Sequence, residues 1–93
     1  MFEKIDSVIN DWANTKNLPL LKEYQGQEVR SLNLNTKKGN QYQIWVEVES
    51  KNIVKISAWN YHKLKVQFTV TNDWITKALD KSFEIVMLWD SEI

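Results

Sequence analysis

The chain has 93 residues with 12 basic and 12 acidic side chains, no cysteine, one histidine and two glycines. This composition excludes disulfides and thiolate metal sites, and it leaves too few residues for a histidine metal site, a catalytic triad or a phosphate-binding loop. No apolar run approaches the ~18 residues of a membrane span, and the first residues do not form a signal peptide. We therefore expect a single compact domain over residues 1–93, cytoplasmic and without enzymatic activity, cofactor or membrane association.

The chain begins with a pattern typical of an amphipathic helix, which we predict over residues 2–14. Apolar side chains recur there at helical spacing, at Phe2, Ile5, Val8, Ile9 and Trp12. Pro19 ends this pattern and could open a short helical turn that Gly26 closes.

The segment 18–27 is too apolar for a free loop and must pack on the rest of the domain. One alternative is that it crosses behind the predicted sheet and buries Trp45 or Trp59.

The middle of the chain alternates apolar and polar residues, which predicts four strands at 28–36, 41–49, 53–60 and 63–71. The apolar residues of these strands fall mainly on even-numbered positions, such as Leu32, Ile44, Ile56 and Val66. Short polar segments with turn-forming residues separate them, which favours an antiparallel meander.

Keeping the apolar positions on one face determines the register of this sheet. Pairing Val48 with Val54 places Trp45 opposite Ser57, one diagonal step from Trp59, so the two indoles are expected to meet. Pairing Ala58 with Leu64 places Trp59 opposite Lys63 and Ser57 opposite Lys65.

A final helix follows Thr71 or Asn72, with a broad apolar half that suits a helix lying across a sheet. Trp12, Trp74 and Trp89 are expected to anchor the helices in the core. The predicted fold class is α+β: a helix, a four-stranded antiparallel meander and a helix, with both helices on the even face of the sheet.

Trp45 and Trp59 occupy odd positions, which the helices leave uncovered, and this is the main functional signal in the sequence. Together with the rim residues Lys55, Lys63, Lys65 and Glu47 they predict a partner-binding face, because tryptophan is enriched in protein interfaces. Glu47 and Glu49 are also suitable ion-pair partners for Lys55 across the strands. We expect a small binding protein with a protein partner, a profile that resembles immunity proteins and small inhibitors.

Two alternatives use the same features. The two tryptophans and the lysines could stack bases and contact phosphates of single-stranded nucleic acid. A four-stranded antiparallel sheet followed by a helix resembles the architecture of single-strand-binding modules of the whirly type, from which the leading helix departs. A structural homodimer, formed through the aromatic face or the first predicted strand, is the other alternative.

Overall fold

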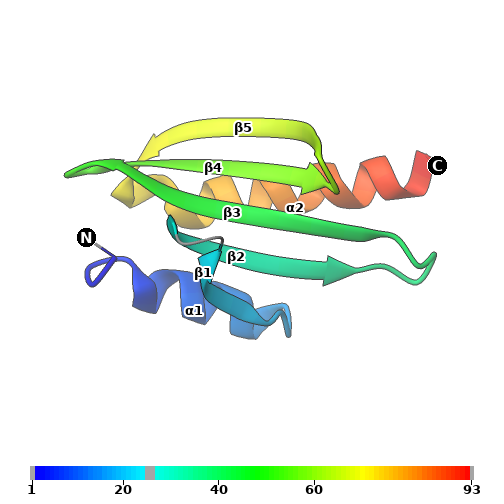
Figure 1. Ribbon diagram of the computed structural model, residues 1–93, viewed down its shortest axis with the longest axis horizontal. Helices are drawn as coiled ribbons and strands as arrows, with labels where there is room; N and C mark the ends of the chain where they lie inside the picture. Colours follow the sequence, from blue (N-terminus) through cyan, green and yellow to red (C-terminus); the bar gives the residue numbers. More distant parts are fainter. Residues whose placement is uncertain (1, 25–26, 93) are drawn as a thin grey trace.

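The computed structural model describes residues 2–24 and 27–92, of which 21–24, 27 and 28 are described by their backbone alone. Helix α1 (Asp6–Thr15) leads into strands β1 (Leu20–Tyr24), β2 (Gln27–Asn35), β3 (Gln41–Ser50), β4 (Ile53–Asn60) and β5 (Lys63–Thr71). A 3₁₀ turn, η1 (Asn72–Trp74), then precedes helix α2 (Ile75–Glu92). The helices and the sheet form two layers (Figure 1). The predicted α+β layout, a helix, an antiparallel meander and a helix, is confirmed.

The five strands form one antiparallel sheet in the order β1-β2-β3-β4-β5. Leu32, Ile44, Val46, Ile56 and Ala58 are fully buried on its even face, because alternate side chains of a strand share a face. Both helices cover this face, and the core contains residues from both helices and from the sheet. Within residues 2–24 and 27–92, no helix lies on the odd face.

Helix α1 places Ile9, Trp12 and Ala13 in the core, the i, i+3, i+4 spacing of one helical face. It begins at Asp6, four residues later than predicted, after a turn. It ends in a Schellman motif: Asn17 has φ +55°, and the Leu18 amide donates to the Ala13 carbonyl at 3.0 Å. This ending returns the chain towards the sheet edge.

The structure adds a strand to the four that the sequence predicted. Residues Leu20–Tyr24, where a helical turn seemed plausible, form β1 and pair antiparallel with β2 at the edge of the sheet. The segment therefore extends the sheet in its own plane, and its backbone does not cross the odd face. Gly26, the predicted end of the turn, lies outside the described residues. Pro19 directly before an edge strand interrupts no ladder hydrogen bond.

The register of β3 with β4 is as predicted, but that of β4 with β5 is not. Ala58 pairs with Val66 and Trp59 with Leu64, so Lys65 is an extra residue in the ladder, a β-bulge. Lys63 pairs with Asn60, and Gln67 pairs with Ser57. The predicted pairs Trp59–Lys63 and Ser57–Lys65 are therefore wrong. Trp74 is 53% exposed at the end of η1 and is not the predicted core residue.

Candidate binding face

The tryptophans of the odd face lie where their neighbours are small. Trp45 pairs with Ser31 on one side and with Ser57 on the other. Both serines are buried, at 0% and 1% exposure, although no helix covers this face. Their small size leaves room for the indole of Trp45 to lie against the sheet, and the half-buried indoles shield the serines in turn.

The two indoles contact each other, as the register predicted. The ring centroids of Trp45 and Trp59 are 5.3 Å apart with an interplanar angle of 36°, within the usual range for an aromatic pair. Trp45 Nε1 donates to Gln43 Oε1 at 2.9 Å, and Trp59 Nε1 donates to Ser57 Oγ at 2.9 Å. These bonds fix the orientation of both rings on the face.

Leu64 extends this apolar surface. The bulge at Lys65 brings Leu64 opposite Trp59, and Leu64 is 48% exposed. Trp45, Trp59 and Leu64 therefore form a row across β3, β4 and β5, which we call the apolar row. The even-odd pattern assigned Leu64 to the core, and nothing in the sequence marks the bulge that moves it.

The charged residues predicted for the rim do not gather around the indoles. Lys55 lies opposite Glu47, and its Nζ is 3.7 Å from Glu47 Oε1 and 3.4 Å from Glu49 Oε1, the ion pairs that the sequence suggested. Lys65 Nζ lies 4.6 Å from the ring centroid of Trp89, in α2, on the covered side of the sheet. Lys63 lies beside Asn60. Of the three lysines, only Lys55 shares the face of the tryptophans.

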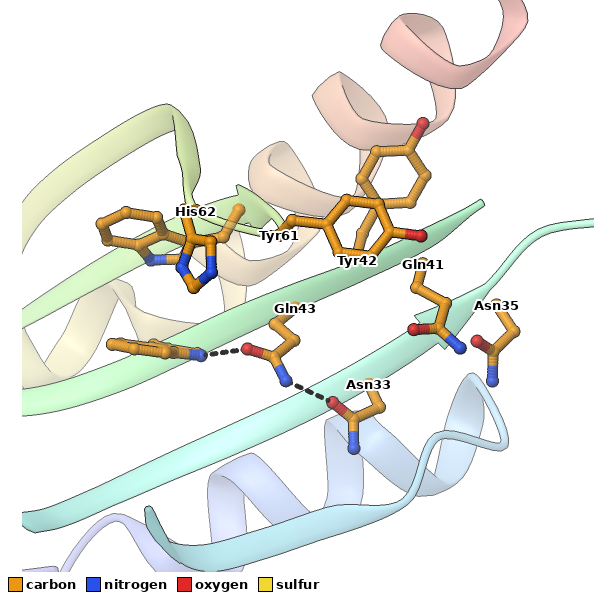
Figure 2. Close-up of a pocket in the computed structure, with 9 residues that line it drawn as sticks. Asn33, Asn35, Gln41, Tyr42, Gln43, Tyr61 and His62 are labelled. Atoms are coloured by element: carbon orange, nitrogen blue, oxygen red, sulfur yellow. Dashed lines mark hydrogen bonds between the residues drawn. The ribbon is translucent and has the colours of Figure 1, made fainter. Parts of the chain in front are cut away.

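A groove of about 610 Å³ borders the apolar row at the end of the sheet where β4 turns into β5. Figure 2 shows its lining, with Gln43 bonded to the unlabelled indole of Trp45 and to Asn33. Carboxamides from β2 and β3 lie along one side, and the β4–β5 turn supplies the other. The lining residues are Asn33, Asn35, Gln41, Tyr42, Gln43, Trp45, Trp59, Tyr61 and His62. None of these described residues has a formal charge at pH 7 when histidine is neutral.

The turn beside the groove holds an aromatic residue in an uncommon conformation. Tyr61 and His62 are the two residues between the paired Asn60 and Lys63. Tyr61 has φ +55°, a region that glycine, asparagine and aspartate adopt more readily, and its side chain is 69% exposed. Strained residues of this kind concentrate at functional sites.

Comparison of the chain with protein-family models, curated proteins and solved structures finds no match. The binding face must therefore be interpreted from its own chemistry.

That chemistry suits recognition. Within residues 2–24 and 27–92, no three carboxylate or histidine side chains gather as a metal site. In the same ranges no helix is long and apolar enough to cross a membrane. His62 lines the groove, and the other lining residues carry carboxamides or aromatic rings. What the face offers is oriented indoles, an exposed leucine and neutral hydrogen-bonding groups.

Proposed function

We propose that this chain is a small binding protein that engages a protein partner through the apolar row on the uncovered face of its sheet. The observation that carries this proposal is the row itself: Trp45, Trp59 and Leu64 lie side by side, and no helix within the described residues lies over them. Buried aromatic anchors of this kind supply most of the affinity in protein interfaces.

The charge distribution of the face fits a protein partner. Lys55 is compensated by Glu47 and Glu49, so the rim beside the row carries a small net negative charge. Charged rims that surround an apolar centre steer association and select partners, whereas the centre provides the affinity. An immunity- or inhibitor-like role is compatible with this arrangement.

Site-specific photo-cross-linking tests the proposal. A photoreactive residue is placed at Leu64 or, as the matched control, at Leu88, which is 56% exposed on α2. We expect a discrete protein adduct from position 64 and none from position 88. The adduct is then identified by mass spectrometry and the partner is purified.

Affinity for the purified partner is the decisive measurement. Trp59→Ala should weaken binding at least about 30-fold, since truncated anchors cost ~2 kcal/mol or more. Lys65→Ala, on the covered side, should leave affinity within about twofold. Equal losses from both variants, or no loss from Trp59→Ala, would show that the row is not the site.

The lysine placement disfavours the nucleic-acid alternative. A single-strand binder needs ammonium groups beside its stacking rings, and Lys55 already contacts two carboxylates. We expect no quenching of tryptophan fluorescence by a mixed single-stranded oligonucleotide at low salt. Quenching that weakens with salt, at a log–log slope of about −2 to −3, would instead favour nucleic acid over protein.

The homodimer alternative through the first predicted strand is wrong, because β1 pairs with β2 and removes that edge. What remains of this alternative predicts that the apolar row pairs with a second copy. Sedimentation of the wild type and of Leu64→Ser distinguishes it, because only a dimer formed through the row dissociates on this substitution. We expect the two to sediment alike.

A further inference from the structure

The groove beside the apolar row has a chemistry of its own, and from it we infer that this chain binds a neutral saccharide there. The groove combines aromatic ring surfaces with carboxamides and carries no formal charge among its described lining residues. Its volume of about 610 Å³ falls within the range of small-molecule sites, about 300–1,000 Å³. The inference goes beyond the proposed protein partner, and it can fail without affecting that proposal.

The hydrogen-bonding capacity of the groove matches hydroxyl groups. Across the described part of the chain, the carboxamides of Asn35 and Gln41 bond to no other side chain or backbone group, and Asn33 uses only its Oδ1. Each carboxamide combines an acceptor oxygen with two N–H donors. A sugar hydroxyl both donates and accepts, so neighbouring hydroxyls can pair with such groups at either end.

Two hydrogen bonds fix the orientation of the Gln43 carboxamide before a ligand binds. Trp45 Nε1 donates to Gln43 Oε1, and Gln43 Nε2 donates to Asn33 Oδ1 at 3.1 Å. This chain of bonds occupies the oxygen of Asn33 and leaves its amino group available as a donor. Polar groups held in place in this way select a ligand without losing side-chain entropy on binding.

The aromatic rings supply the apolar contact that a sugar requires. A pyranose ring presents C–H groups on its faces and hydroxyls around its edge. Trp59 and Trp45 lie at one end of the groove, and the exposed Tyr61 rises from the turn beside them. The two-residue turn requires the positive φ of Tyr61, +55°, and this position places a 69% exposed aromatic ring where asparagine or glycine is the usual residue.

Other ligand classes fit the groove less well. A nucleotide would bring a phosphate, and the one predicted lysine on this face is held by Glu47 and Glu49. An extended peptide adds to the edge of a sheet through its backbone, whereas the groove lies on a face. A neutral, hydroxyl-rich ring satisfies both the carboxamides and the aromatic surfaces.

Titration of the isotopically labelled full chain with soluble oligosaccharides tests the inference. The probes are cellohexaose, chitohexaose, maltohexaose, xylohexaose and mannohexaose, with a heparin hexasaccharide as the charged comparison. We expect at least one neutral probe to shift the indole N–H signals of Trp45 and Trp59 and the side-chain amide signals of Asn35 and Gln41, saturably. If no neutral probe shifts these signals at about 10 mM, ten times a weak Kd of ~1 mM, or if only heparin does, the inference is wrong.

A double variant and a matched control test whether the probe binds in the groove and not elsewhere on the face. Asn35→Ala combined with Gln41→Ala should weaken binding of the responding probe at least about fivefold, the loss expected for one or two hydrogen bonds. Gln67→Ala removes a carboxamide that is exposed on β5 outside the groove and should change nothing. Unchanged affinity of the double variant overturns the inference.

Leu64→Ser distinguishes this inference from the proposed function. Leu64 belongs to the apolar row but does not line the groove, so this variant should keep saccharide affinity and lose affinity for the protein partner. Because the row and the groove share both tryptophans, a saturating saccharide should also compete with the partner. Loss of saccharide binding in Leu64→Ser would place the sugar on the row and contradict the groove as its site.

Discussion

Arg30 shows how a single side chain joins the first helix to the sheet. Its Nε and Nη2 atoms donate to the two carboxylate oxygens of Asp6 at 2.7 and 3.0 Å. Its guanidinium carbon lies 3.9 Å from the ring centroid of Phe2. Only 7% of the Arg30 side chain is exposed, so solvent screens this pair little. The planar guanidinium group makes both contacts at once.

Arg30→Lys should therefore destabilise the protein although it keeps the charge. Lysine cannot form the two-pronged contact or stack flat on Phe2, and we expect a loss of about 1–3 kcal/mol in urea unfolding. The matched control is Lys81→Ala, which breaks the exposed pair with Glu84 and should cost less than about 0.5 kcal/mol. Similar losses from both substitutions would mean that burial does not set the value of the pair.

At Tyr61, the backbone conformation that places the ring beside the groove lowers the stability of the fold. Tyr61→Asn should stabilise the fold by about 0.5–1 kcal/mol, because asparagine tolerates φ +55° better than tyrosine does. The melting temperature should rise by about 2–8 °C in a domain of this size. Tyr61→Phe keeps the strained backbone and the exposed ring, and it should melt with the wild type. A Tyr61→Asn protein that melts below the wild type would show that the ring itself stabilises the turn.

The sequence predicts the tryptophans of the site better than their surroundings. Trp45 and Trp59 follow from position parity alone, since the strand period of two places them opposite the core. Leu64 and Lys65 could not be assigned in this way, because one extra residue in β5 exchanges their faces and leaves no mark in the composition.

At the scale of elements, a cluster around Asp90 joins the end of α2 to the β2–β3 turn. Asp90 Oδ1 accepts hydrogen bonds from Asn40 Nδ2 at 2.7 Å, from the Tyr42 hydroxyl at 2.9 Å and from Thr36 Oγ1 at 3.2 Å. Lys38 Nζ donates to the Asp90 carbonyl at 3.0 Å. These bonds hold the last turn of the helix over the sheet, far along the chain from the turn that it contacts.

The hydrogen bond from Asn40 lowers the pKa of Asp90 below its ordinary value of 3.8, with further lowering by Tyr42, Thr36 and Lys38 against the opposing effect of burial. The ionised carboxylate therefore stabilises the fold above pH 3.8, and this contribution is lost as the pH falls through the lowered pKa. Burial and the bond to Asp90 raise the pKa of Tyr42 to about 12, so the phenol donates throughout the neutral range.

Melting temperatures of the wild type and of Asp90→Asn should accordingly differ most at neutral pH, begin to converge below about pH 3.8, and meet once the pH has fallen through the lowered pKa of Asp90. Asp73→Asn, at an exposed acid in the turn before α2, is the control and should follow the wild type at every pH. If the difference in melting temperature between Asp90→Asn and the wild type stays constant down to about pH 2, the stabilisation comes from the packing and hydrogen-bond geometry of Asp90 and not from its charge.

Strand β1 is an element that the sequence pattern could not predict. Its residues mix apolar and charged side chains over only five positions, too few to establish a period. What the sequence does indicate is that the segment must pack against the domain, and pairing with β2 satisfies that requirement while Leu20 contacts the core. The longer strands and both helices have enough periods to be predicted within a few residues.

At the scale of the whole molecule, α1, α2 and the sheet share one core. Trp12 of α1 donates from Nε1 to Asp80 of α2 at 2.7 Å, and its ring meets Phe83 edge-on at 5.9 Å. The fully buried Ile9, Ile56 and Ile75 come from α1, β4 and α2. Because these elements bury the same surface, none should unfold alone.

Three matched substitutions test this cooperativity. Ile9→Val, Ile56→Val and Ile75→Val should each cost about 0.5–1.5 kcal/mol and lower one shared transition, seen alike by helical circular dichroism and by tryptophan fluorescence. Ile53→Val is the control, since Ile53 is 38% exposed and should lose little. If α1 were a separate unit, Ile9→Val would shift the helical signal and the fluorescence of Trp12 in α1, and it would leave in place the transition that the sheet residues Trp45 and Trp59 report. Coincident shifts would instead mean that a partner bound on the odd face stabilises α1 as well, because the helix and the binding face belong to the same unfolding unit.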